Sequence, residues 1–130
     1  MFRYLVNKFI KLDYVKDLYN EKYNELKQTH NFWAKVLEYL KITYSVNSLE
    51  NIPDKGPVII VSNHPFGLLD GLIISSIVSN IRNDYRILIN QEITQIDLIK
   101  KYLLPIKFSE ITEDIKNNIK SKKNAIKFVN

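Results

Sequence analysis

The sequence predicts an α/β protein, with an N-terminal helical hairpin over residues 1–50 and a partial αβα layer with a mostly parallel sheet over residues 51–130. Three observations predict this class. Apolar residues recur with helical spacing before residue 43, and a short β-branched run follows a turn cluster near residue 57. Helical and strand-like patterns then alternate to the last residue, the order that produces parallel strands joined by helices.

The first segment is predicted to be helical up to about Ile42. Its first apolar stripe recurs at i, i+3, i+4, i+7 and i+8 and contains Phe2, Leu5, Val6, Phe9 and Ile10. The polar, tyrosine-rich residues 16–28 are predicted to continue this helix, and a second helix is predicted over residues 32–42 with Asn31 as N-cap. Such a hairpin packs on the rest of the domain or lies at a lipid headgroup layer, and the two interpretations are compatible.

The second segment begins after a turn cluster that contains Pro53, Gly56 and Pro57. The β-branched run Val58–Val61 is predicted to be a strand buried on both faces. The elements expected after it are helix, strand, helix, strand and helix, over residues 71–81, 85–89, 93–103, 106–108 and 110–128. Pro105 is expected to end the second of these helices, and Thr112 is the candidate cap of the last.

The last predicted helix has no strand after it. Because a helix in a parallel α/β layer normally leads to a further strand, we expect the layer to be truncated at its C-terminus. With 130 residues the chain is long enough for one small domain.

Composition excludes several classes of function. The chain has no cysteine, which excludes disulfide scaffolds and thiolate chemistry, and its two histidines lie far apart without an acidic cluster, so no metal is expected. The formal charge of +5 favours anionic partners. The lysines are scattered and no nucleic-acid motif is present, so nucleic acid is not expected. The most apolar stretch, Leu68–Val78, is too short to span a membrane.

Residues 63–71 gather the reactive groups of the chain. They follow the predicted strand directly, and open α/β sheets bind ligands at the carboxyl ends of their strands. Pro65 biases His64 toward an extended backbone, and Gly67 permits a turn with positive φ that brings Asp70 back toward the imidazole. A carboxylate that accepts from Nδ1–H would orient the ring and leave Nε2 as a general base.

Taken singly, these residues also have structural explanations. A lone histidine near a strand end is usually structural, and aspartate at a helix start is usually a cap. Their combination after a predicted strand favours chemistry. Because the sequence has no Gly-x-Ser-x-Gly element, the attacking hydroxyl or amine would come from the substrate.

The motif Asn63-His64-Pro65-Phe66-Gly67, followed by Asp70-Gly71, resembles the first motif of the glycerolipid (lysophospholipid) acyltransferase family, closest to its hemolysin-like branch. The resemblance extends from about Ile52 to about Pro105 and covers the N-terminal part of the family domain only. It implies that His64 is the general base and that Asp70 orients it. The residues that would shape the loop or bind substrate are Asn63, Pro65, Phe66, Gly67 and Gly71.

The chain departs from the family pattern at three points. His64 and Asp70 are separated by one residue more than is commonest in the family. The Phe-Pro-Glu-Gly-like turn that helps to bind the acceptor's phosphate has no counterpart. Where the family offers a glycine and an arginine near the third strand, this sequence supplies Lys107, the candidate phosphate contact.

The resemblance implies transfer of a fatty acyl group from acyl-carrier protein or acyl-CoA to a lysolipid or glycerol-phosphate-like acceptor. No bound cofactor is expected, and the protein would act peripherally at the cytoplasmic face of the membrane. The alternative is a catalytically inactive, truncated relative that binds a membrane surface.

Overall fold

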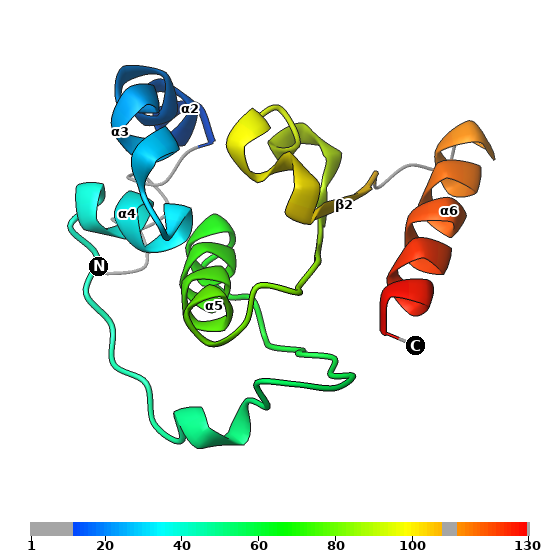
Figure 1. Ribbon diagram of the computed structural model, residues 1–130. Coiled ribbons are helices and arrows are strands. Elements are labelled where there is room, and N and C mark those ends of the chain that lie inside the picture. The colour runs from blue at the N-terminus through cyan, green and yellow to red at the C-terminus, as the bar shows by residue number, and fades with distance from the viewer. Residues whose placement is uncertain (1–11, 108–111, 130) are drawn as a thin grey trace. The chain divides into compact units, whose positions relative to one another are not determined.

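The computed structural model describes residues 12–107 and 112–129 (Figure 1). The chain divides into two compact units: the first comprises Met1–Asp54 with Ile60–Asn83, and the second comprises Lys55–Ile59 with Asp84–Asn130. The predicted stripe from Phe2 to Ile10 lies outside the described residues. The predicted α/β class is confirmed, since several helices accompany a small parallel sheet.

The first unit is helical. Its elements are α2 (Leu12–Glu21), α3 (Tyr23–Gln28), α4 (Phe32–Tyr39), the short 3-10 helix η1 (Leu49–Asn51) and α5 (Leu68–Ile81). The helix predicted over residues 16–28 is interrupted only at Lys22, where φ is −101° and ψ is 13°. The helix predicted over residues 32–42 ends earlier, at Tyr39.

The core of the first unit lies where α4 packs against α5 (Figure 1). Trp33, Val36 and Leu37 occupy one face of α4 and are buried, as helical spacing requires. Leu72 and Val78 are buried on α5. A core at this helix pair fixes the axis of α5, whose first turn carries Asp70.

Asn31 caps α4 as predicted. Its side-chain oxygen accepts a hydrogen bond from the Ala34 amide at 3.1 Å, and its Nδ2 donates to Asn80 Oδ1 at 2.8 Å. The first bond satisfies an amide that the helix start leaves unpaired. The second joins the start of α4 to α5, so one side chain serves both helices.

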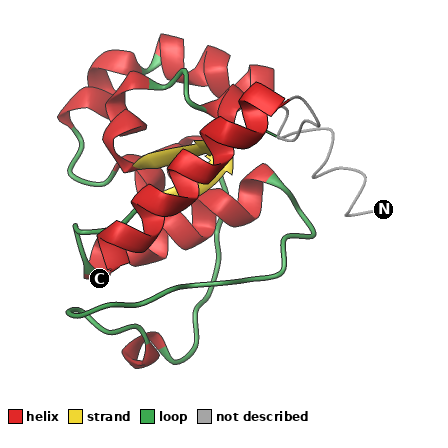
Figure 2. Cartoon of the chain, turned by 90° about the vertical axis from the view of Figure 1, so that its right-hand side faces the viewer, coloured by secondary structure: helices red, strands yellow, loops and turns green. Residues whose placement is uncertain are grey.

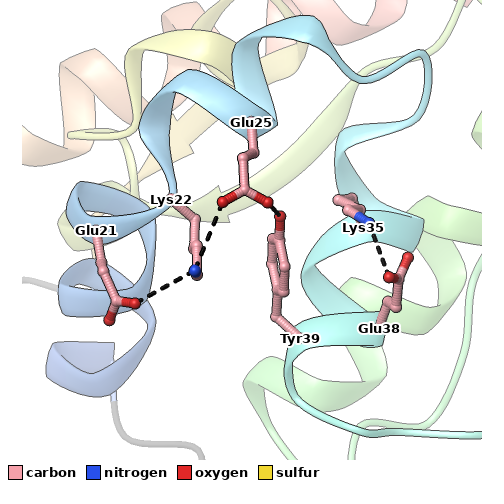
Figure 3. Close-up of polar contacts among 6 residues, drawn as sticks. All are labelled: Glu21, Lys22, Glu25, Lys35, Glu38 and Tyr39. Atoms are coloured by element: carbon pink, nitrogen blue, oxygen red, sulfur yellow. Dashed lines mark hydrogen bonds and ion pairs between the residues drawn. The ribbon is translucent and has the colours of Figure 1, made fainter.

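A polar network on the exposed surface joins α3 to α4 (Figure 3). The Tyr39 hydroxyl donates a hydrogen bond to the Glu25 carboxylate, and the ammonium groups of Lys22 and Lys35 lie 5.7 Å and 5.1 Å from the Tyr39 ring centroid. The bond to Glu25 raises the pKa of Tyr39 to about 12, and the same bond lowers the pKa of Glu25. These pKa shifts come from a structural hydrogen bond on the surface, with smaller contributions from neighbouring charges.

The prediction of a strand over Val58–Val61 is wrong. Residues 57–64 adopt no regular secondary structure, and Figure 2 shows them within a long loop. Ile59 is 74% exposed and Val61 is 86% exposed. A strand needs a neighbour for its backbone hydrogen bonds, and the sheet in the described residues consists of two later strands that pair with each other. β-branched side chains alone therefore do not make this run a strand.

The second unit contains that sheet (Figure 2). Its elements are β1 (Ile87–Asn90), the 3-10 helices η2 (Gln91–Ile93) and η3 (Asp97–Tyr102), β2 (Leu103–Ile106) and α6 (Thr112–Val129). The strands are parallel, with Ile87 opposite Leu103 and Ile89 opposite Pro105. The parallel sheet and the strand near residues 85–89 are thereby confirmed.

The connection between the strands differs from the prediction. Two short 3-10 helices replace the α-helix expected over residues 93–103, and Pro105 lies inside β2 instead of ending a helix. Pro105 is exposed and lacks an N–H, so it suits an edge position. The strand expected over residues 106–108 thus comes earlier, and Phe108 lies outside the described residues.

The long last helix is confirmed as α6, and Thr112 is its first residue. The expected start at Glu110 falls outside the described residues. Across residues 12–107 and 112–129, no helix combines the length and the apolar character that crossing a bilayer requires.

Candidate active site

Gly67 allows the chain to turn into α5. It is the N-cap residue, with φ of +61° and ψ of −123°, a backbone conformation that residues with a Cβ rarely adopt. The turn continues through two backbone hydrogen bonds, from the Gly67 amide to the His64 carbonyl at 3.5 Å and from the Asp70 amide to the Gly67 carbonyl at 3.2 Å. Because of this turn, His64 and Asp70 lie on adjacent parts of one tight loop.

Asp70 is the third residue of α5, and its carboxylate points back toward the loop. Its Oδ2 accepts a hydrogen bond from the Phe66 amide at 2.7 Å. An acidic side chain at this helical position commonly bonds to backbone before the helix, where the helix dipole also favours negative charge. The Asp70 side chain is only 16% exposed, so the carboxylate is held in one place.

His64 lies beside this carboxylate. Its Nδ1 is 3.4 Å from Asp70 Oδ2, and its side chain is 60% exposed. The separation is slightly longer than the 2.7–3.2 Å of an ordinary N–H···O bond, and catalytic pairs without substrate are often longer than in the reacting complex. The structure therefore brings together the two residues that the sequence predicts as a pair.

This arrangement can act as a base with an orienting group. In the neutral imidazole one nitrogen carries a proton and the other accepts one. A carboxylate beside Nδ1 favours the tautomer with the proton on Nδ1, which leaves Nε2 to take a proton from a substrate. An exposed imidazole is accessible to such a substrate.

The other predicted loop residues occupy the same turn. Asn63 and Pro65 are exposed, and Gly71 lies half-buried in the first turn of α5. Phe66 is 37% exposed, and it contributes its backbone amide to Asp70. The sequence does not predict this backbone bond, because the helix expected over residues 71–81 in fact begins at Leu68, which makes Asp70 its third residue.

Lys107 belongs to the second unit. Its Nζ lies 3.2 Å from Asp114 Oδ2, and its backbone exchanges two hydrogen bonds with the Asn118 side chain, at 2.9 Å and 2.7 Å. These contacts attach the end of β2 to α6. A role for Lys107 in binding phosphate stays a prediction.

An open depression of about 390 Å³ lies in the first unit, formed by α4, the segment that follows it and Ser76 of α5. Leu37 and Ile42 line it together with Tyr44, whose hydroxyl donates to Ser76 Oγ at 3.1 Å. Ser76 follows Asp70 by six residues, or about 9 Å along the helix axis.

The residue that follows α5, Arg82, contacts the segment that precedes residues 63–71. The buried guanidinium of Arg82 donates to the Pro53 carbonyl at 3.1 Å. Among the described residues, no group of three or more His, Cys, Asp or Glu side chains could hold a metal ion.

The part of the chain that contains His64 and Asp70 matches a known protein family. A family model described as an acyltransferase matches residues 4–116, which include the whole loop and most of the 130-residue chain. The chain belongs to this acyltransferase family. The match agrees with the resemblance of the motif at residues 63–71 to acyltransferases. No curated protein and no solved structure matches the chain.

Membership of the acyltransferase family assigns the protein to the transferases at a general level. The His64–Asp70 contact places an imidazole beside a carboxylate, a pair that could remove a proton from an acyl acceptor.

Proposed function

We propose that the protein transfers a fatty acyl group from a thioester, carried by acyl-carrier protein or coenzyme A, to a lysolipid or glycerol-phosphate-like acceptor. The observation that carries the proposal is the contact between His64 Nδ1 and Asp70 Oδ2, at the start of α5 and inside the family match. His64 is the general base and Asp70 orients it.

The reaction is a direct attack without an acyl-enzyme. Nε2 of His64 takes the proton from the acceptor's hydroxyl or amine as that oxygen or nitrogen bonds to the thioester carbonyl carbon. The tetrahedral oxyanion then collapses, the carbon–sulfur bond breaks, and the imidazolium returns its proton to the leaving thiolate. Asp70 stabilises the imidazolium while it exists.

Two features of the loop support these roles. The Phe66 amide holds Asp70 Oδ2 in place, so a small rotation of the exposed imidazole shortens the 3.4 Å separation to a charge-assisted bond. The first turn of α5 presents backbone N–H groups and the positive end of the helix dipole, which would stabilise an oxyanion.

The proposed substrates fit the chemistry of the chain. Acyl-carrier protein, coenzyme A and glycerol phosphates are anionic, and the chain carries a formal charge of +5. The thioester is a co-substrate, and we propose action at the cytoplasmic face of a membrane.

The proposal is tested by thiol release from acyl-carrier protein and acyl-CoA donors in the presence of a lysolipid panel. His64→Ala should lower kcat about a hundredfold or more, the usual weight of a general base. Asp70→Asn keeps an oxygen for the Phe66 amide but removes the charge, and should lower kcat about tenfold or more.

The matched controls use residues of the same type. His30→Ala changes the chain's other histidine, which is exposed, and Asp97→Asn changes an exposed aspartate in the first turn of η3. Both should keep the wild-type rate. A His64→Ala protein that is folded by circular dichroism and still turns over normally would exclude the mechanism.

A further inference from the structure

Helix α6 exposes a row of large apolar side chains. Ile115, Ile119 and Ile126 are 45%, 48% and 61% exposed. Residues spaced by four and eleven positions lie on one face of an α-helix, because each residue advances about 100° around the axis. The three isoleucines therefore form one stripe along the helix.

A different face of α6 attaches the helix to its own unit. Asn118 bonds to the Lys107 backbone, and Ser121, three residues further along that face, is 8% exposed. Phe128 lies under the Arg86 guanidinium, 4.3 Å from the ring centroid. The helix thus contacts its unit through polar and small residues and through Phe128, and leaves its isoleucines exposed, the reverse of an ordinary surface helix.

Lysines line one side of this isoleucine stripe. Four exposed lysines recur at i, i+4, i+7 and i+11: Lys116, Lys120, Lys123 and Lys127. Lys122 flanks the stripe on its other side. The acidic residues of α6 are both in its first turn, and one of them, Asp114, pairs with Lys107. The surface around the isoleucines is therefore strongly basic.

We propose that the isoleucine stripe of α6 docks on the surface of an anionic lipid bilayer. The isoleucines would enter the boundary between headgroups and acyl chains, and the lysines would reach the lipid phosphates along their flexible stems. Lysine is depleted in protein–protein interfaces, whereas each lysine near an anionic membrane adds attraction. The charge pattern thus favours a lipid surface over a protein partner, and the proposal does not depend on catalysis.

The absence of cysteine allows a direct test with the full chain. Ile119→Cys, labelled with an environment-sensitive fluorophore, reports from the stripe, and Asn117→Cys on another exposed face is the matched control. Phosphatidylcholine vesicles containing phosphatidylglycerol should shift the emission at position 119 to the blue, and brominated lipid should quench it. Position 117 should change little. Equal responses at the two positions would overturn the proposal.

Vesicle co-sedimentation tests whether the lysines beside the isoleucine stripe contribute to membrane binding. Replacing Lys116, Lys120, Lys123 and Lys127 by Gln should weaken binding to anionic vesicles by about six-hundredfold, from about fivefold for each of the four lysines. The control replaces four exposed lysines elsewhere, Lys27, Lys41, Lys55 and Lys100, and should lose far less. An equal loss would show that only net charge matters and would overturn the docking site.

Two further outcomes would also contradict docking on lipid. Emission at position 119 that is already blue-shifted without vesicles would mean that protein covers the stripe. A doubled mass in size-exclusion chromatography with light scattering, abolished by Ile119→Ser, would assign the stripe to a second copy of the chain.

Discussion

Asp70 uses a single carboxylate oxygen for two contacts. Its Oδ2 accepts from the Phe66 amide at 2.7 Å and lies 3.4 Å from His64 Nδ1. The first contact positions the carboxylate and the second serves the proposed base. The pair could be predicted from the spacing of histidine, proline, glycine and aspartate in residues 64–70, since the glycine turn brings the ends together. The Phe66 amide is a backbone group, so residue identity gave no direct sign of it.

The turn at Gly67 can be tested against its neighbour Gly71. An added Cβ meets nothing within 4 Å at either position, so only the backbone conformation differs. Gly67→Ala should destabilise the fold by about 1–3 kcal/mol because φ is +61°. Gly71→Ala lies in a helix and should stabilise it by about 0.5–1 kcal/mol. Chemical denaturation measures both changes, and equal effects would contradict this view of the loop.

At the scale of elements, the cap at Asn31 can be predicted from the sequence because capping depends on local chemistry. Asn31→Ala removes the bond to the Ala34 amide and the bond to Asn80, and should cost about 1–2 kcal/mol of unfolding free energy. Asn80→Ala removes only the exposed bond between helices and should cost about 0.5 kcal/mol. Denaturant titration ranks the two variants, and a larger cost at Asn80 would contradict the capping role.

The hydrogen bond between Tyr39 of α4 and Glu25 of α3 predicts a change in the pKa of the Tyr39 hydroxyl. Tyr39, with a pKa raised to about 12 by its bond to Glu25, should lose its proton later than a tyrosine at the ordinary value of 10.0. Since the folded pKa is raised, the bond stabilises the fold below about pH 10, and this contribution is lost as pH rises toward 12. Phenolate absorbance, taken as the difference between wild type and Tyr39→Phe, measures the value.

Glu25→Gln should move this transition toward 10.0, because it removes the negative acceptor that holds the hydroxyl proton. Glu50→Gln makes the same change at an exposed carboxylate in η1 and should leave the curve unaltered. An unchanged curve in Glu25→Gln would mean that the hydrogen bond does not set the pKa of Tyr39.

Elements that depend on distant partners were the ones predicted wrongly. The run Val58–Val61 has the composition of a buried strand but lies in a loop, with Ile59, Ile60 and Val61 exposed. Strand formation requires a neighbour in space, which local composition does not supply. The connection between β1 and β2 lies where the sequence predicts it. It consists of two 3-10 helices, however, and not of an α-helix.

At the scale of the whole molecule, the class of fold could be predicted because the alternation of patterns after residue 57 is strong. The division into two units could not, because it depends on which segments pack together and not on sequence order. The acyltransferase family follows from the match over residues 4–116, and the proposed function adds to it the loop motif and the geometry of His64 and Asp70.

The most direct test of the proposed acyl transfer is a measurement of both products in one reaction. The protein is incubated with an acyl thioester, with and without a lysolipid acceptor, and released thiol and acylated lipid are quantified by mass spectrometry. Direct attack predicts thiol and acylated lipid in equal amounts, and only when the acceptor is present. Thiol release without acceptor, or an acyl group found on the intact protein, would contradict it.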